Sequence, residues 1–335
     1  MSDENRMDIS IVIVNWNTKD MLRDCLNSIK KEKGMLTVQT LVIDNDSADG
    51  SREMVGYDFP EVKLINSGGN VGFAKANNIA TGYAESQLVL FLNPDTIVLP
   101  GSLQKMVNYM DVNPTVGALG CMMIGADGEP QPLGLQWNPT PVTKLIEMLF
   151  ISTETLDKIK SILPYKDPYQ SGQVKILFGG CLMVRKAILD QVGWFDERYF
   201  MYVEDADLCR KIAERGWRLY YLSEAQIVHL GGGATKNRSS KYETLMTLES
   251  LSKSMMKHYG KSGYWMYRLV VFVGSNARLI VLSIIRIMSI GHSIDRSNNT
   301  AMSFNKYSTM LKWSLGVEKP NIPAGFINGH QASSR

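Results

Sequence analysis

The feature that most constrains the fold is an alternation of short, apolar, β-branched runs with amphipathic stretches. The first run, Ile9–Asn15, has the sequence ISIVIVN, which is typical of a central parallel strand covered on both faces. An amphipathic stretch over residues 19–33 follows it. The later apolar runs are Thr40–Ile43, Val62–Ile65 and Leu88–Leu92, and Gly72–Ala84 has a helical pattern. This alternation predicts right-handed βαβ units, and therefore an α/β fold with a parallel sheet.

Polar residues end these apolar runs. They are Asn15, Asp44, Asn66 and Asn93–Asp95. The carboxyl ends of parallel strands lie at one edge of a sheet, and ligands bind beyond that edge. We therefore expect these side chains to converge on one site. The convergence is a stronger signal than any single residue, because each residue alone also fits a turn or a helix cap.

Asp95 and His229 are candidates for a cation site. Asp95 lies at a strand end in the sequence LNPDT, where a carboxylate can hold a hard divalent cation on a diphosphate. The same Asn-Pro-Asp sequence is also an ordinary turn. His229 ends another apolar run, and a neutral imidazole there can complete a metal site with Asp95. A lone histidine is more often structural, so both interpretations stay open.

Two further segments suit a nucleotide. Asp44 ends its run in LVIDNDSADGS, where it either recognises a base or ribose or caps a helix. The segment NSGGNVGFAKANN contains Gly68, Gly69, Gly72 and Asn77 but lacks GxGxxG and the Walker lysine, which argues against a dinucleotide or ATP site. Its glycines either permit a turn or let the backbone approach a diphosphate.

The acidic cluster Glu204-Asp205-Ala206-Asp207 opens a predicted helix. Acidic residues there compensate the helix dipole. Three acids in four residues exceed what capping requires, so one of them is a candidate general base, which an acceptor hydroxyl needs in order to become a nucleophile. Near this cluster we also predict a strand within Lys175–Val184, and strands at Arg218–Leu222 and Gln226–Leu230.

Charge and cysteine content narrow the class of protein. Residues 251–335 contain eleven Lys or Arg and two acids, although the whole chain has a formal net charge of only +3, so the C-terminal part suits an anionic surface. No motif or aromatic array for nucleic acid accompanies this charge. The polar start MSDENRMDIS lacks a signal peptide. Cys25, Cys121, Cys181 and Cys209 form no CxxC pair and do not suggest a disulfide framework or a zinc site. With the expected lack of a signal peptide, this predicts a cytoplasmic location.

Seven motifs occur in the order seen in bacterial family 2 glycosyltransferases. They are VIVNWN, VIDNDSADGS, GNVGFAKANN, LNPDT, GGCLMVRK, GWFDERYFMYVEDADLCRK and HLGGGAT, within residues 8–235. The chain most resembles the rhamnosyltransferase-type members that build cell-surface polysaccharides. The resemblance implies a GT-A fold with a Rossmann-like, mostly parallel central sheet and flanking helices. It also implies a nucleotide-diphosphate sugar donor and inversion by single displacement.

The resemblance also implies roles on the donor side. Asn15 and Asp44 would contact the nucleoside, and Gly72 and Asn77 would lie beside the donor. The same motifs place four more residues with the donor: Asn17, Asn70, Asn93 and Gly180.

In the resemblance, Asp95 is the metal-binding end of the DxD-type motif. His229 is the further ligand of relatives with an H-x-G-G pattern, and the implied cofactor is Mg²⁺ or Mn²⁺. The chain departs from the DxD pattern at Asn93, which leaves fewer carboxylates for the cation.

On the acceptor side the resemblance makes Asp205, the second acid of the ED pair, the base, and places Trp194 and Glu204 nearby. The leading donor is dTDP-rhamnose, and the acceptor is a cell-surface polysaccharide or a lipid-linked glycan. The alternatives are a UDP-hexose or UDP-galactofuranose transferase, or a catalytically weak nucleotide-sugar-binding protein. A sugar nucleotidyltransferase is disfavoured because VNWNTKD lacks the Gly-rich segment with Arg and Lys after the first strand.

We expect a catalytic domain over residues 1–235, with a nucleotide-sugar half at about 8–123 and an acceptor half at about 124–235. A helical extension over 236–290 and a polar, partly disordered tail over 291–335 would follow. Trp265–Met288 is the most apolar stretch, but Arg268, Arg278 and Arg286 interrupt it. It therefore suits an interfacial helix whose arginines meet lipid phosphates, at the inner face of the cell membrane. A packed helix and a homodimer surface are the alternatives.

Overall fold

The computed structural model describes residues 7–131, 138–149, 167–231, 240–288 and 294–323. Within these residues one sheet has the strand order β3-β2-β1-β4-β8-β6-β9-β5, and β7 pairs with β9. The strands are β1 (Ile9–Asn15), β2 (Val38–Asp44), β3 (Lys63–Asn66), β4 (Leu88–Leu92), β5 (Thr96–Val98), β6 (Val116–Ile124), β7 (Gly172–Val174), β8 (Cys181–Arg185) and β9 (Arg218–His229). This confirms the predicted α/β class.

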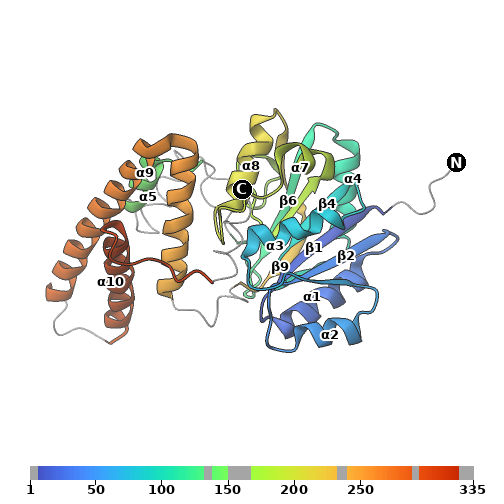
Figure 1. Ribbon diagram of the computed structural model, residues 1–335, viewed down its shortest axis with the longest axis horizontal. Coiled ribbons are helices and arrows are strands. Elements are labelled where there is room, and N and C mark those ends of the chain that lie inside the picture. The colour runs from blue at the N-terminus through green and yellow to red at the C-terminus, as the bar shows by residue number, and fades with distance from the viewer. Residues whose placement is uncertain (1–6, 132–137, 150–166, 232–239, 289–293, 324–335) are drawn as a thin grey trace.

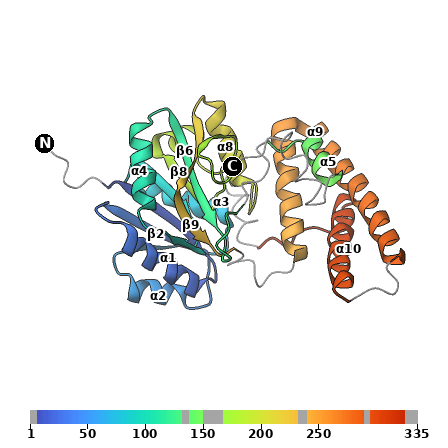
Figure 2. The ribbon, with the colours of Figure 1, turned by 180° about the vertical axis from the view of Figure 1, so that it is seen from behind.

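The helices fall into two groups (Figure 1). Those around the sheet are α1 (Lys19–Glu32), α2 (Ser51–Asp58), α3 (Phe73–Ile79), α4 (Ser102–Val112), α7 (Lys186–Val192) and α8 (Glu204–Glu214), with a short 3-10 turn, η1, at Ala80–Gly82. Those beside the sheet are α5 (Pro141–Leu149), α9 (Ser240–Met288) and α10 (Ile294–Ser314). The second group forms a separate helical unit on the side of the molecule away from the N-terminus (Figure 2).

The parallel part of the sheet brings the predicted strand ends together. β1 pairs in parallel with β2 and β4, and β2 pairs in parallel with β3. In this register Asn15 lies beside Asp44, and Asp44 lies beside Asn66. The expected convergence at one edge is therefore confirmed for these three residues.

The second half of the sheet differs from the sequence prediction. The strand predicted within Lys175–Val184 is β8, which begins only at Cys181; β7 ends at Val174, and the loop between them reaches the strand-end edge. Arg218–Leu222 and Gln226–Leu230 are not two strands but parts of β9, whose pairing with β6 shifts register between Leu222 and Gln226. The polar residues there look like a turn in sequence, but the structure makes them an irregularity within one strand.

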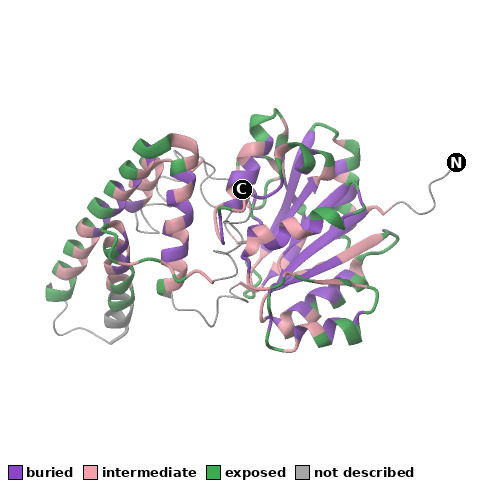
Figure 3. Cartoon of the chain, viewed as in Figure 1, coloured by how far each residue is buried: buried purple, intermediate pink, exposed green. Residues whose placement is uncertain are grey.

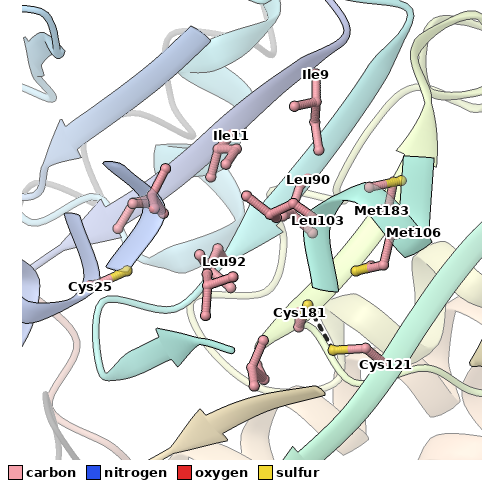
Figure 4. Close-up of a cluster of buried hydrophobic side chains, with 14 of the residues drawn as sticks. Ile9, Ile11, Cys25, Leu90, Leu92, Leu103, Met106, Cys121, Cys181 and Met183 are labelled. Carbon is pink, nitrogen blue, oxygen red and sulfur yellow. Dashed lines mark hydrogen bonds between the residues drawn. The ribbon is translucent and has the colours of Figure 1, made fainter. Parts of the chain in front are cut away.

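Both faces of the sheet are covered. Ile9, Ile11 and Ile13 pack with α1, α2 and α4, whereas Val12 and Val14 face α3, α7 and α8. This alternation along β1 is what a fully buried strand requires. Figure 4 shows part of the core on the face covered by α1, α2 and α4.

The four cysteines are free and buried. Two of them, Cys121 and Cys181, lie with their sulfur atoms 3.1 Å apart (Figure 4). The hydrogen bond with the Cys121 thiol, and then burial, hold the pKa of Cys181 well above its usual range. Both thiols therefore belong to the core rather than to an exposed reactive site.

The helical unit has its own core, to which α5, α9 and α10 contribute Met148, Leu248, Tyr267 and Trp313. α9 is kinked at Gly260, where φ is 65°. Residues 294–314 form α10, so the polar tail predicted from residue 291 is wrong in that segment. Low apolar content suggested a tail, but Trp313 and Tyr307 are enough to anchor this helix on α9.

The second half of α9 has an exposed face, which we call the apolar face (Figure 3). Its residues are Trp265, Leu269, Phe272, Ile280, Ile284 and Ile287. By length and composition, Lys241–Ile287 could cross a membrane, and only 22% of its most apolar window is buried. The domain boundary expected at residue 235 lies outside the described residues.

Candidate active site

A cavity of about 490 Å³ lies at the strand-end edge, between the sheet and the helical unit. One wall, called the sheet wall, comes from strand ends and the loops that follow them: Val14, Trp16, Asn45, Asn70, Gly72, Asn93, Asp95, Phe178, Gly180 and His229. The opposite wall, called the helical wall, comes from the start of α8 and from α5 and α9: Met201, Tyr202, Val203, Glu204, Asp205, Ala206, Lys144, Thr247 and Leu251.

Asp95 and His229 face each other in the sheet wall. His229 Nε2 lies 3.5 Å from Asp95 Oδ1, and both side chains are buried. β5 pairs with β9, which brings these distant residues to the same place. The prediction that the two residues lie at one point is therefore confirmed.

Gln131, which the sequence interpretation missed, holds the His229 ring. Its amide nitrogen donates to the His229 carbonyl at 2.9 Å, and its oxygen lies 2.9 Å from Nδ1. Since that oxygen can only accept, Nδ1 donates its proton to Gln131, and Nε2 faces Asp95. A carbonyl or carboxylate partner on the second nitrogen is the usual way to orient a metal-binding histidine.

These residues fit a divalent cation. A carboxylate oxygen and an unprotonated imidazole nitrogen both offer lone pairs to the same space, and a cation satisfies both. No group of three or more His, Cys, Asp or Glu that could hold a metal occurs within the described residues. Diphosphate oxygens and water would therefore have to supply the remaining ligands.

The loop after β3 reaches the sheet wall through hydrogen bonds. Asn45 donates to Asn70 Oδ1 at 3.2 Å, and its own oxygen accepts from the backbone N–H of Val71 at 2.9 Å. Gly72 has a φ of 84°, and a Cβ there would meet the carbonyl oxygen of Phe200 at 2.5 Å. Glycine is thus required for contact with Phe200 as well as for the turn.

Asn15 and Asp44 form a buried polar cluster behind the sheet wall. Asn15 Nδ2 donates to Asp44 Oδ1 at 3.2 Å and to Ser47 Oγ at 2.9 Å. Arg52 approaches Asp44 at 3.6 Å. Asn17, with a φ of 53°, accepts from the backbone N–H of Ala48 at 2.7 Å. These three predicted residues fix the loop after β2 and do not line the cavity.

Asp205 lies in the helical wall with its carboxylate held by the backbone. The N–H of Gly179 donates to Oδ2 at 2.9 Å, and the N–H of Ala206 donates to Oδ1 at 2.7 Å. Burial raises the pKa of Asp205 despite these hydrogen bonds. Each carboxylate oxygen keeps a free lone pair, so Asp205 has the geometry and the basicity of a proton acceptor.

Glu204 also lies in the helical wall and is only 6% exposed. Its Oε2 is buried and has no hydrogen-bond partner. Burial, and then the negative charge of Asp205, raise the pKa of Glu204 to about 8. The preceding residues Tyr202 and Val203 have φ of 70° and 74°. Such values are strained for bulky side chains, and strain of this kind is concentrated at functional sites.

Two predicted site residues lie elsewhere. Asn77 is buried in α3 and donates to the carbonyl of Phe73 at 3.0 Å. Trp194 packs edge-on against Phe91 in the core, and its Nε1 donates to Asp190 at 2.9 Å. Neither side chain lines the cavity. Asn93 and Gly180 do line it, and a Cβ at Gly180 would lie 3.3 Å from Asn93 Nδ2.

A buried charge network fixes α8 to α9. Asp207 accepts from Lys257 Nζ at 2.7 Å and lies 2.9 Å from His258 Nε2. Lys257 also pairs with Asp196 at 2.7 Å. Asp207 therefore serves the packing of α8 against α9.

Arg268 and Arg278 do not project toward solvent as an interfacial helix would require. Arg268 donates to the carbonyls of Trp313 and Ser314, and Arg278 donates to the carbonyl of Met148. Both guanidinium groups are thus engaged near the ends of α10 and α5, and their contact with lipid phosphates stays a prediction. Arg286 is exposed.

Comparison with known proteins points in one direction. The family model described as glycosyl transferase family 2 matches residues 10–193, more than half of the chain. N-acetylglucosaminyl-diphospho-decaprenol L-rhamnosyltransferase of Mycobacterium tuberculosis is 31% identical over 57% of this chain and 66% of its own length. The rhamnosyltransferase WbbL of Escherichia coli is 25% identical over 66% of this chain and 83% of its own length. The chain thus spans slightly less than two thirds of the mycobacterial relative.

Among solved structures, the chain is similar to a mannosyltransferase from Pyrobaculum calidifontis in complex with GDP-Man and Mn²⁺. The TM-score is 0.54 at 15% identity, and the match covers 93% of this chain and 88% of the other. At this identity the likeness bears on the fold alone.

Proposed function

The chain belongs to glycosyl transferase family 2, and from this premise we propose that it moves rhamnose from dTDP-rhamnose to a hydroxyl of a lipid-linked glycan. It is a glycosyltransferase with a GT-A fold, as the sequence resemblance implied. The names of the mycobacterial and Escherichia coli relatives support rhamnose. The mycobacterial relative's name also supports an acceptor sugar carried on a diphospho-lipid. Transfer of a UDP-hexose or of UDP-galactofuranose is the alternative.

One observation carries the proposal: the cavity has a cation-type pair on one wall and a carboxylate base on the other. Asp95 and His229 stand in the sheet wall, and Asp205 stands in the helical wall. A donor diphosphate beside the first pair places the sugar between the two walls. A nucleotide-sugar-binding protein without catalysis would not need a base on the opposite side.

Asp205 acts in the transfer step. The acceptor hydroxyl gives its proton to a carboxylate oxygen of Asp205 while its oxygen forms a bond to the anomeric carbon. The bond from that carbon to the diphosphate oxygen breaks, and the nucleoside diphosphate leaves with the electron pair. Attack from the side opposite the leaving group inverts the anomeric configuration. The N–H groups of Gly179 and Ala206 orient the carboxylate for this role.

The donor side is held by the sheet wall. Asp95 and His229 would hold Mg²⁺ or Mn²⁺, which neutralises the charge of the diphosphate when bound. Asn70, Asn93 and Gly180 would lie along the donor. Contact of Asn15 or Asp44 with the nucleoside would require Arg52 to turn away from Asp44.

The test is a panel of dTDP- and UDP-sugars with an N-acetylglucosaminyl diphospho-lipid acceptor, in Mg²⁺, in Mn²⁺ and in EDTA. We expect transfer from dTDP-rhamnose, inverted product and no turnover in EDTA. Thermal stabilisation provides a second measurement, of about 2.7 kcal/mol at a hundredfold excess of a ligand over its dissociation constant. Full activity in EDTA would exclude the metal site. Transfer only from a UDP-sugar would show that dTDP-rhamnose is not the donor.

The apolar face of α9 suits a membrane surface that carries such an acceptor. Its six residues recur at helical spacing and are 38–68% exposed, and Trp265 is of the type that lies at lipid interfaces. On this basis we propose that the enzyme works at the inner face of the cell membrane, in assembly of the cell envelope. Because Arg268 and Arg278 are engaged within the helical unit, the interaction would be mainly apolar.

Sedimentation with anionic and neutral liposomes tests this placement. We expect the protein to bind both kinds, and Ile280→Glu together with Ile284→Glu to release it. Val112→Glu, at a 76% exposed position on α4, is the matched control. If the protein does not bind liposomes and sediments as a dimer, the apolar face is a contact with a second copy of the chain.

A further inference from the structure

Glu204 is the one acidic residue of the cavity that the transfer step leaves without a role and that has a buried oxygen without a partner. Its Oε2 makes no hydrogen bond, and only 6% of the residue is exposed to solvent. Native proteins rarely leave such an atom unpaired unless a water, an ion or a ligand satisfies it. Since the residue lines the cavity, a ligand bound there is the candidate partner.

We propose that the Glu204 carboxyl is a hydrogen-bond donor that binds a hydroxyl of the acceptor sugar, next to the hydroxyl that Asp205 deprotonates. This inference rests on the proposed function, in which the helical wall receives the acceptor. Two adjacent carboxyl groups with different protonation suit two adjacent hydroxyls of one ring. The acceptor class is then a sugar with a vicinal diol, of which one oxygen attacks and the other binds Glu204.

The surroundings of the two carboxyl groups explain the difference between them. Asp205 receives two backbone N–H groups, which favour its charged form. Glu204 Oε2 has no donor near it, and the neighbouring charge of Asp205 disfavours a second charge. Pairs of acids whose surroundings separate their protonation in this way commonly divide two roles in catalysis.

The other charged groups around the cavity do not cancel this effect. On α5, the Lys144 ammonium already pairs with Glu147 at 2.6 Å. Across the cavity, the sheet wall contributes Asp95 and His229. The residues of α9 that line the cavity, Thr247 and Leu251, are uncharged.

The strained loop before α8 supports a binding role. Val203 is the N-cap of α8 with a φ of 74°, a region that β-branched residues rarely adopt. Ser250 of α9 donates to the carbonyl of Met201 at 2.7 Å and so fixes the start of this loop. The fold therefore holds Glu204 at the cavity at an energetic cost, which a purely structural carboxylate does not require.

The first measurement needs no acceptor. The full chain, labelled with ¹³C at glutamate carboxyls and free of divalent cations, is titrated by NMR, and Glu204→Gln identifies the signal. We expect one carboxyl to titrate near pH 8 and to be missing in the variant. If every glutamate titrates below pH 6, Glu204 is charged at neutral pH and the proposal is overturned.

The second measurement uses the acceptor of the proposed function and the analogue that lacks the hydroxyl next to the glycosylated one. Glu204→Leu should lower kcat/KM for the intact acceptor about tenfold or more, and Glu204→Gln, which keeps a donor, should restore most of that loss. With the deoxy analogue, wild type and Glu204→Leu should become equal, because the partner hydroxyl is gone.

Equal losses in the Gln and Leu variants, or a deoxy effect that persists in Glu204→Leu, would overturn the contact with the sugar. If the chosen acceptor is not glycosylated at all, the proposed acceptor is wrong. The NMR titration then still decides whether Glu204 carries the proton that the inference requires.

Discussion

The two walls of the cavity differ in how their polar groups are satisfied. In the sheet wall Asn45, Asn70 and His229 each have hydrogen-bond partners before any ligand arrives. In the helical wall Glu204 has an oxygen without a partner, and Tyr202 and Val203 hold a strained backbone. The sheet wall is thus preorganised for one type of ligand, whereas the helical wall is completed by the ligand itself.

The difference follows from how each wall is built. Strand ends are fixed by the sheet register, which holds their side chains at little cost. The helical wall depends on α8 being pressed against α9 by Asp207, Lys257 and His258. Under the proposed function, this arrangement would keep donor binding separate from acceptor choice.

The largest effect is expected from removal of the carboxylate in the sheet wall. Asp95→Ala should abolish transfer and weaken donor binding in the presence of Mn²⁺, because the cation loses a carboxylate ligand. Asp111→Ala, at an exposed position on α4, is the control. Calorimetric titration with dTDP-rhamnose measures both variants, and unchanged donor affinity in Asp95→Ala would remove the distinction between the walls.

The next effect concerns the attachment of the helical wall. Lys257→Met removes the ammonium from the fully buried Asp207 and should lower the free energy of unfolding by about 3 kcal/mol or more. Glu214→Ala, which breaks the exposed pair with Arg210 in the same helix, should cost under about 1 kcal/mol. Urea denaturation compares them. Similar small losses would show that α8 is held by other contacts.

A smaller effect is expected at Gln131, which holds the His229 ring of the proposed cation site. Gln131→Leu leaves the His229 ring without its partner and should weaken Mn²⁺ binding in the presence of dTDP by about 10–100-fold. Gln131→Glu keeps an acceptor oxygen and should lose less. Mn²⁺ binding followed by electron paramagnetic resonance distinguishes them, and equal affinities in all three proteins would leave Gln131 with a packing role only.

A separate effect is a pH dependence of stability from the helical wall. Burial, and then the charge of Asp205, raise the pKa of Glu204 on folding from its ordinary value of 4.5 to about 8, so the folded chain binds more protons than the unfolded chain between these values. Stability should fall as pH rises through this window, by at most about 1.4 kcal/mol per pH unit. Glu204→Gln should lack this contribution. Parallel curves of Tm against pH for the two proteins would contradict the raised pKa.

The sequence predicted the sheet wall well because its signals are local. A β-branched run that ends in a polar residue identifies both the strand and the edge, as for Asn15, Asp44 and Asp95. The same signal wrongly suggested that Asn15 and Asp44 line the cavity. Their side chains instead fix the loop after β2. Asn77 likewise does not reach the cavity, because its side chain donates to the Phe73 carbonyl within α3.

The helical wall was harder to predict because its residues come together only through packing. Lys144, Thr247 and Leu251 reach the cavity from α5 and α9, and no local pattern marks them. The motif around Trp194 suggested an acceptor contact, but an indole flanked by Phe91 and Asp190 belongs to the core. Gln131 carries no sequence signal either, since its role depends on the position of His229.

The assignment of the base to Asp205 is the centre of this account, and single-turnover kinetics test it most directly. Asp205→Asn should keep the dissociation constant of dTDP-rhamnose within about twofold and lower the rate of transfer by roughly 10² to 10⁴. Glu204→Gln should retain measurable turnover with the same donor affinity. Near-normal transfer in Asp205→Asn together with collapse in Glu204→Gln would contradict the account and move the base one residue back.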